Sequence, residues 1–193
     1  EVYPGYPGLV VAEGDTRVMT WGFPLVLKGK NGQPLRPKPV NNAREDKLGT
    51  SFWHPSFERR RCLIPVSQWA EPQGQPRRMT RSWYGLPDSD LFAVAGLWRP
   101  TAEWGDCYTL VMVDSSAQMA EVHDRMPVIL PRADWPRWTG GPGPRSGRPA
   151  RTRRLDSPFA GRAVTHVDYG TNTRCFLPTW LEHHPPRTQK PWV

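Results

Sequence analysis

Apolar residues along the chain are grouped in short runs that are separated by residues typical of turns. Short runs of this kind are typical of strands. Glu13, Gly14 and Asp15 indicate a turn between the first two runs. The predicted strands cover residues 9–11, 16–23, 61–71, 82–86, 92–98 and 108–113, and a further apolar run covers 126–130.

Helical signals are short by comparison. Residues 41–48 are expected to open a short helix, with Asn42 as its cap and Glu45 three residues later. Residues 114–122 combine a cap-like Asp-Ser-Ser start with helix-forming residues, and residues 132–138 predict a third short helix. Because 23 Pro and 17 Gly break the chain into short elements, the pattern favours strands and loops over a helical bundle.

Three segments lack a regular pattern of apolar residues. Residues 28–39 are rich in Gly, Pro and Lys and predict a surface loop. Residues 140–154 combine Gly and Pro with a cluster of Arg and predict a mobile basic loop, and residues 183–193 form a Pro-rich tail. We predict a single α+β domain over residues 1–193, in which mostly antiparallel strands curl into a barrel-like sheet with a few short helices packed outside.

The charge and the aromatic content of the chain suggest a class of partner. The net charge is +8 and comes mainly from Arg, whose guanidinium group suits phosphate contact and stacking. The chain also contains 10 Trp, and unpaired bases stack on aromatic faces. Together they are compatible with single-stranded nucleic acid, although a basic composition is equally consistent with an ordinary solvated surface.

The cysteines exclude two common kinds of site. Cys62, Cys107 and Cys175 are odd in number and widely spaced, so neither a disulfide framework nor a tetrahedral zinc site is expected. Cys62 and Cys107 lie in apolar stretches and are predicted to be buried. We expect no cofactor and no metal. No apolar run approaches the roughly 18 residues of a membrane span, and no signal segment opens the chain, so we expect a soluble cytoplasmic protein without a membrane partner.

Three segments place polar residues beside apolar strands, at residues 42–45, 61–71 and 123–130. Glu71 and His123 are a possible acid–base pair. Each also has an ordinary structural interpretation, because a lone histidine before a strand is usually satisfied in the fold and a lone glutamate at a strand end is usually solvated. The spacing does not establish whether the two side chains meet.

These segments, in this order, resemble the SOS response-associated peptidase (SRAP) family. That family has an Asn-Ala-Arg segment, an Arg-Cys-Leu-Ile-Pro strand with a Glu ten residues after its Arg, an Ala-Gly-Leu-Trp strand and a His-x-Arg-Met-Pro-Val-Ile-Leu segment. The corresponding blocks here are residues 42–45, 61–65 with Glu71, 95–98 and 123–130. Residues 21–24, Trp-Gly-Phe-Pro, resemble a further family strand, and the likeness covers about residues 17–138.

The resemblance implies a defined chemistry on abasic sites in single-stranded DNA. In the family, the amine of an N-terminal Cys condenses with the ring-opened aldehyde of the site, and its thiol closes a thiazolidine ring. Cleavage of the protein's own N-terminal extension accompanies this activity. The resemblance implies that Asn42, Glu71 and His123 are catalytic: Glu71 shuttles protons with a raised pKa, His123 protonates the departing sugar oxygen, and Asn42 holds the terminal amine or the sugar.

The resemblance further implies residues that hold the DNA. Arg44 and Arg125 would bind the phosphates that flank the lesion, and Trp21 would supply a stacking face. Alternatives remain open for two of them, since Arg44 could pair with Glu45 or Glu71, and Trp21 could belong to the core. The expected partner is single-stranded DNA that contains abasic sites, and the protein is expected to act as a monomer. We expect it to be encoded by a bacterium or a phage and to lie in the cytoplasm, at damage sites in the nucleoid.

Two departures from the family limit what carries over. Pro72 follows Glu71 where the family often has Trp, and a proline there alters the local backbone and removes a hydrogen-bond donor. The sequence begins with Glu1 instead of Cys, so we expect the segment with the nucleophile to be missing from it and the chain as written to bind abasic DNA without crosslinking.

Two other classes of function stay open. One is a noncovalent single-stranded DNA-binding module. The other is a metal hydrolase using His123, His166, His183 and His184, which lack a ligand spacing such as His-Glu-x-x-His.

Overall fold

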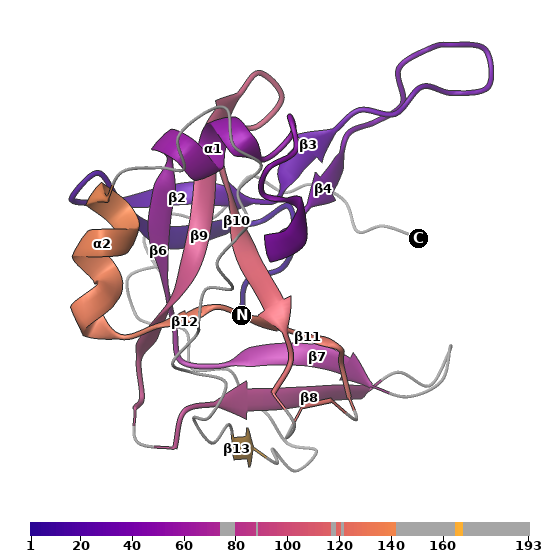
Figure 1. The fold of residues 1–193 in the computed structure, drawn as a ribbon. Helices are drawn as coiled ribbons and strands as arrows, with labels where there is room; N and C mark the ends of the chain where they lie inside the picture. The colour runs from indigo at the N-terminus through magenta and orange to yellow at the C-terminus, as the bar shows by residue number, and fades with distance from the viewer. Residues whose placement is uncertain (74–79, 88, 117–118, 121, 142–164, 168–193) are drawn as a thin grey trace, which may run out of the picture.

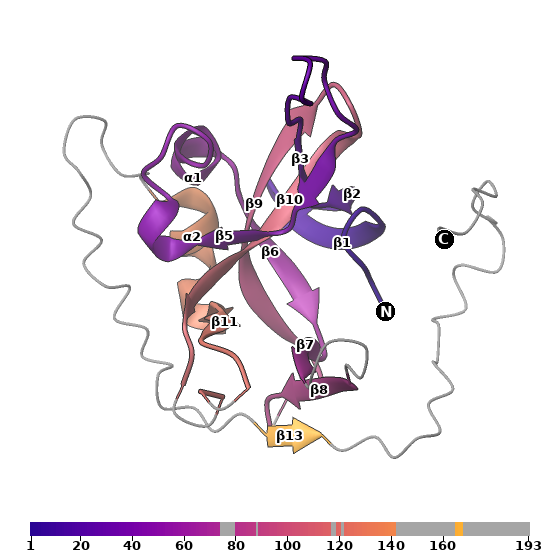
Figure 2. The ribbon, with the colours of Figure 1, turned by 90° about the vertical axis from the view of Figure 1, so that its right-hand side faces the viewer.

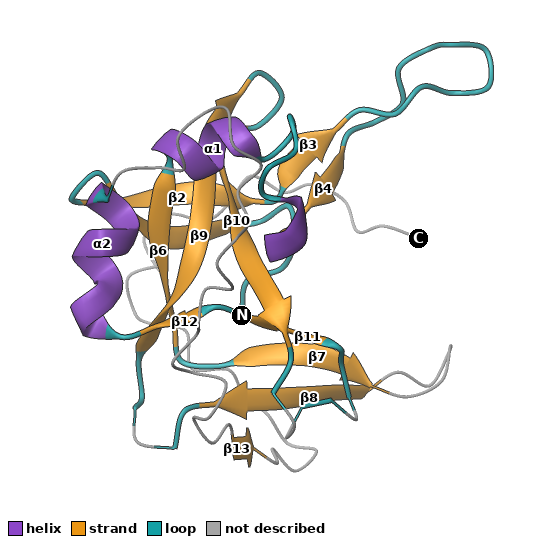
Figure 3. Cartoon of the chain, viewed as in Figure 1, coloured by secondary structure: helices purple, strands orange, loops and turns teal. Residues whose placement is uncertain are grey.

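A computed structural model gives the fold and describes residues 1–73, 80–87, 89–116, 119–120, 122–141 and 165–167. Strands make up most of it, and the few helices are short (Figure 3). No helix within the described ranges is long and apolar enough to cross a membrane.

Five strands close into a small barrel (Figure 1). Around the barrel, β10 pairs with β2, β2 with β1, β1 with β6, β6 with β9, and β9 with β10 again. All of these pairings are antiparallel except β10 with β2, which is parallel. The predicted curled, barrel-like α+β fold is therefore confirmed. The barrel strands are β1 (Pro7–Ala12), β2 (Asp15–Trp21), β6 (Arg61–Val66), β9 (Phe92–Thr101) and β10 (Gly105–Asp114).

Shorter strands extend the barrel at its edges. β10 leaves the barrel flanked by β5 on one side, in parallel, and by β11 on the other, antiparallel. β7 and β8 form a hairpin below the barrel, and β3 and β4 form a second hairpin that projects from it (Figures 1 and 2). These strands are β3 (Phe23–Leu25), β4 (Lys38–Val40), β5 (Asn42–Arg44), β7 (Trp69–Gln73), β8 (Thr80–Gly85), β11 (Arg125–Pro127), β12 (Ile129–Leu130) and β13 (Thr165–Val167).

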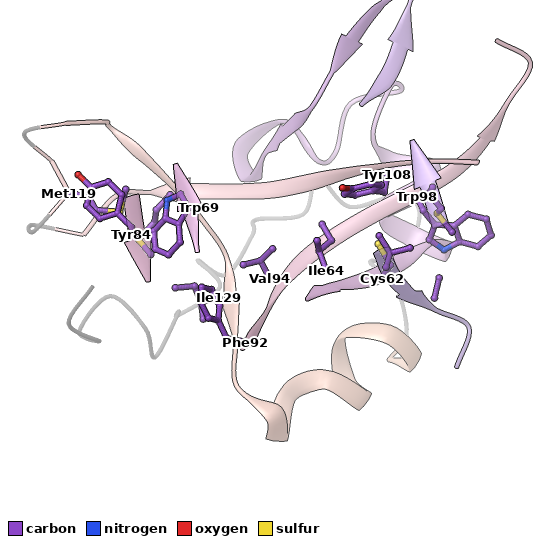
Figure 4. Packing of buried hydrophobic residues seen from close by; sticks show 14 residues of the cluster. Cys62, Ile64, Trp69, Tyr84, Phe92, Val94, Trp98, Tyr108, Met119 and Ile129 are labelled. Atoms are coloured by element: carbon purple, nitrogen blue, oxygen red, sulfur yellow. The ribbon is translucent and has the colours of Figure 1, made fainter. Parts of the chain in front are cut away.

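The barrel interior is filled by alternate side chains of its strands, because successive residues of a strand point to opposite faces. Val10, Ile64 and Val94 are fully or almost fully buried there. The same cluster continues out of the barrel to Trp69 and Tyr84 on the β7–β8 hairpin (Figure 4). One apolar core therefore connects the barrel to the hairpin that carries Glu71.

A second layer covers the outer face of β6, β9 and β10. It is formed by α1 (His54–Arg59), α2 (Trp135–Gly140) and the 3-10 turns η1 (Glu45–Lys47) and η2 (Arg132–Asp134). Arg61 joins these parts, because its guanidinium donates to the carbonyls of Phe57 and Glu58 at 2.9 and 3.3 Å and to those of Trp138 and Gly141. Burial lowers the pKa of Arg61. The first residue of the Arg-Cys-Leu-Ile-Pro block thus has a structural task.

Several local predictions need correction. Residues 41–48 do not form a helix: Asn42–Arg44 is strand β5, because Ala43 is buried under the pairing with β10, and only a 3-10 turn follows. Residues 61–71 are two strands with a break between them, and helix α1 was not predicted. The loop over 28–39 ends in strand β4 from residue 38. The described part of 114–122 forms hydrogen-bonded turns.

Candidate functional site

Glu71 is a buried carboxyl group on the inner face of the β7–β8 hairpin. Only 8% of it is exposed. It lies opposite Ser82 in the register of the hairpin, two pairs along from Trp69 and Tyr84 and on the same face. The rings of Trp69 and Tyr84 stack at 5.6 Å. Burial raises the pKa of the Glu71 carboxyl above its ordinary value, because the apolar surroundings disfavour the charged form.

His123 lies within electrostatic reach of Glu71. A positive charge on the imidazole lowers the pKa of the Glu71 carboxyl and opposes the larger effect of burial. The backbone N–H of Arg125 donates to His123 Nδ1 at 3.0 Å. The same Nδ1 lies 3.1 Å from the carbonyl of Arg125, so the Arg125 backbone accommodates Nδ1 with or without a proton. Nε2 takes part in no described hydrogen bond and is the nitrogen left for a bound molecule. About a third of the His123 side chain is exposed, so solvent or a ligand can reach it.

The pair of Glu71 and His123 can carry out acid–base chemistry. A carboxyl group with a raised pKa takes up and releases a proton at higher pH than an ordinary carboxyl, and an imidazole is a second acid–base group. The described residues contain no group of three or more His, Cys, Asp or Glu side chains placed to hold a metal ion. Cys62 and Cys107 are buried as predicted, and burial raises the pKa of both thiols, which makes them poor nucleophiles.

Asn42 and Arg44 share the exposed face of β5, while Ala43 between them is buried. In the parallel register, Asn42 lies beside Leu110 and Arg44 beside Met112. Leu110 packs against the barrel core that continues to the β7–β8 hairpin. Asn42 therefore lies on the face of the sheet that turns toward that hairpin, although no described hydrogen bond joins it to Glu71 or His123.

Arg44 and Arg125 share a carboxylate. Arg44 donates to both oxygens of Asp46, each at 2.9 Å, and Arg125 lies 3.8 Å from the same group. Hydrogen bonds from Arg44 lower the pKa of Asp46. Arg125 also lies 3.5 Å from Asp114. The described carboxylate partner of Arg44 is thus Asp46, and both arginines have carboxylate neighbours.

Trp21 is held in place by contacts with three neighbouring segments. It is partly buried, its ring stacks on Tyr108 at 6.5 Å, and its Nε1 donates to the carbonyl of Asn41 at 3.1 Å. This bond ties Trp21 to the residue before Asn42. The first residues of the chain run past it, because the backbone N–H of Trp21 donates to the carbonyl of Tyr6 at 2.9 Å.

Comparison with known proteins identifies the family. A family model described as SOS response associated peptidase (SRAP) matches residues 1–168. The chain belongs to the SRAP family. Two Bacillus subtilis relatives of it are named abasic site processing proteins: YobE is 34% identical over 106 residues, which is 50% of this chain and 47% of YobE. YoqW is 31% identical over 129 residues, which is 62% of this chain and 55% of YoqW. The chain spans about half the length of these relatives.

Solved structures share the fold of this chain. A crystal structure from Bordetella bronchiseptica superimposes with a TM-score of 0.64 at 20% identity, covering 87% of each chain. One from Bacteroides thetaiotaomicron superimposes with a TM-score of 0.56 at 16% identity, covering 71% of this chain and 64% of that one. At these identities the likeness concerns the fold alone.

In this SRAP chain, four of the six predicted site residues form two groups, while Trp21 is bonded to Asn41, the residue before Asn42. His123 interacts electrostatically with Glu71 of the β7–β8 hairpin. Arg44 and Arg125 both lie within 4 Å of Asp46. Arg125 follows His123 by two residues and therefore connects the groups. Sequence reasoning missed Asp46 and Ser82, and no sequence signal distinguishes them from other surface or strand residues. Cys175, most of the basic loop 140–154 and the tail 183–193 lie outside the described residues.

Proposed function

We propose that this chain binds single-stranded DNA at an abasic site and processes that site with Glu71 and His123. The observation that carries the proposal is the buried Glu71 carboxyl within reach of His123, in a SRAP chain whose relatives are named abasic site processing proteins. We further propose that residues 1–193 act as one domain and as a monomer in the cytoplasm.

The proposed first step opens the sugar ring. An abasic site is a cyclic hemiacetal in equilibrium with an open aldehyde. Glu71 in its ionised form accepts the proton of the C1 hydroxyl, the bond from C1 to the ring oxygen breaks, and His123 in its protonated form gives the Nε2 proton to that oxygen and becomes neutral. One proton is taken and one is given, so the net charge of the site is unchanged. The raised pKa of Glu71 supports this role, because it makes the carboxylate a stronger base than an ordinary one.

The proposed second step is covalent and belongs to a protein with an N-terminal Cys. Its amine attacks the aldehyde and water leaves, giving an imine. The thiol sulfur then adds to the imine carbon, and the nitrogen takes up a proton, which closes the thiazolidine ring. In this chain Glu1 lies 3.5 Å from Arg81, and Arg81 lies opposite Pro72, the neighbour of Glu71. A residue joined to Glu1 would therefore begin beside the hairpin that carries Glu71.

The remaining residues are proposed to hold the strand. Asn42 would orient the amine or the sugar, and Trp21 would stack on a base next to the lesion. Arg44 and Arg125 would bind flanking phosphates, each exchanging its carboxylate neighbour for a phosphate oxygen. Peptidase-type cleavage of the protein's own N-terminal extension would use the same Glu71 and His123.

The test is a covalent trap. A protein with an N-terminal Cys ahead of these residues is incubated with a single-stranded oligonucleotide containing one abasic site, and the products are separated under denaturing conditions. We expect a shifted band with abasic DNA, no band with the intact oligonucleotide, and a slower reaction for Glu71→Gln and His123→Gln. Absence of the band from the Cys-bearing protein would sink the crosslinking chemistry, and equal affinity for intact DNA would favour a noncovalent binding module.

A further inference from the structure

The hairpin of residues 23–40, here called the basic arm, projects away from the barrel (Figures 1 and 2). It contains β3, β4 and the loop between them. Its four charged residues are all basic and all exposed, and it contains no Asp or Glu. The arm therefore carries +4 of the net charge of +8 of the chain. The basic residues are Lys28, Lys30, Arg36 and Lys38.

The charge of the basic arm is less compensated than the charge of the predicted DNA-binding arginines. Arg44 and Arg125 lie within 4 Å of carboxylates. In contrast, Lys28, Lys30 and Lys38 form no ion pair with any residue in the described part of the chain. Unpaired exposed cations bind a polyanion with little competition, and they release its condensed counterions when they do so.

The base of the basic arm is fixed to the candidate site. Its two ends follow Trp21 and precede Asn42, and the Trp21 side chain bridges them through the carbonyl of Asn41. Phe23 is fully buried under the guanidinium of Arg99, 4.1 Å above its ring. Gly22 has φ of +110°, and a Cβ there would come within 2.5 Å of Pro39, so this close approach of the two strands requires glycine. The arm is therefore held in one direction relative to Trp21 and Asn42.

We propose that the basic arm binds the phosphodiester backbone of the strand that leaves the candidate site, on the side of Trp21. The inference rests on the proposed function, and it adds a second contact region that the predicted site residues do not include. The arm contains Phe23 but no other aromatic residue, and Phe23 is buried, so the arm has no ring on which a base could stack. Its contacts should therefore be to phosphates and independent of sequence.

The test compares two variants with the same loss of charge. Lys28, Lys30 and Lys38 are replaced together by Ser in the first. In the control, Arg59, Arg132 and Arg137 are replaced by Ser; all three are exposed on or beside α1 and α2 and lie outside the arm. The affinity of each protein for a single-stranded oligonucleotide with one abasic site, and for the intact oligonucleotide, is measured between 50 and 200 mM salt.

Three phosphate contacts at about 0.7 each should lower the slope of log Kd against log salt by about 2 in the arm variant. The wild type should then lose roughly twentyfold more affinity than the arm variant over this range. The control should keep the wild-type slope, and the preference for abasic over intact DNA should persist in all three proteins. An arm variant with the slope of the control overturns the arm proposal. A lower slope in the arm variant, together with equal affinity of the wild type for abasic and intact DNA, supports the arm proposal and refutes the proposed function instead.

Discussion

Replacement of Arg61 by Met is expected to destabilise the fold strongly. The Arg61 guanidinium donates to four backbone carbonyls, from Phe57, Glu58, Trp138 and Gly141. These carbonyls lie at the C-terminal ends of α1 and α2, where intrahelical partners are lacking and the helix dipole favours a cation. Met fills similar space but satisfies none of them.

The magnitude follows from these bonds and from the cost of burying the charge. A hydrogen bond to a charged group contributes about 1.5–3 kcal/mol. The net contribution of the four bonds is smaller than their sum, because the guanidinium loses its bound water when it is buried. The lowered pKa of Arg61 reflects that loss. Removing one partner of a buried charged interaction costs about 3–5 kcal/mol, and we expect Arg61→Met to fall in this range. That is a large share of the roughly 5–15 kcal/mol of a typical domain.

The assay is equilibrium unfolding in guanidinium chloride, with Arg59→Met as the matched control. Arg59 lies two residues away but is exposed, and its ion pair with Glu58 at 3.4 Å is solvated. Its removal should change the free energy of unfolding by less than about 1 kcal/mol. Arg61→Lys keeps the charge but spans fewer carbonyls and should lie between the two. If Arg61→Met is no less stable than Arg59→Met, the carbonyl contacts do not hold the two helices and the reasoning fails.

Three further predictions concern single side chains. Glu71→Gln should raise the melting temperature at neutral pH and lose this advantage in acid. The pKa of the Glu71 carboxyl is raised in the folded state, so its contribution to stability is complete below the unfolded-state pKa and is lost as pH rises through the folded-state pKa. Equal melting temperatures of the two proteins at every pH would contradict this. Gly96→Ala should cost about 1–3 kcal/mol, since its Cβ would lie 2.7 Å from Cys62 Sγ. Gly85→Ala, with neighbours no closer than 3.4 Å, is the control, and similar urea midpoints for the two would be evidence against a close-packed barrel. Cys62 should resist alkylation in the native protein and react after denaturation, as mass spectrometry can measure.

The barrel could be predicted from the sequence because most of its strands are short apolar runs bounded by turn residues. The local assignments failed where tertiary pairing outweighed local preference. Asn42 and Glu45 have the residue types of a helix start, but the pairing of Asn42–Arg44 with β10 buries Ala43 and keeps the segment extended. Pro65 and Val66 gave no indication that the strand breaks before Trp69, because the break depends on which sheet each half joins.

The candidate site was predictable in its members but not in its arrangement. Glu71 and His123 could be selected from the blocks they share with the family, yet they are 52 positions apart (123 minus 71), and only the fold brings them within electrostatic reach. The pairing of Arg44 with Asp46 was missed because two exposed residues at this spacing carry no pattern. The charge of the basic arm is visible in the sequence, but its direction depends on the buried Phe23 and on Gly22.

A single comparison tests most directly whether Glu71 and His123 form a site for abasic DNA. The dissociation constant of this chain is measured for an abasic single-stranded oligonucleotide and for the intact oligonucleotide of the same sequence, at one salt concentration. We expect tighter binding to the abasic strand, and a smaller preference in Glu71→Gln and His123→Gln with unchanged affinity for intact DNA. Equal affinity of the wild type for the two oligonucleotides would contradict the assignment of this site.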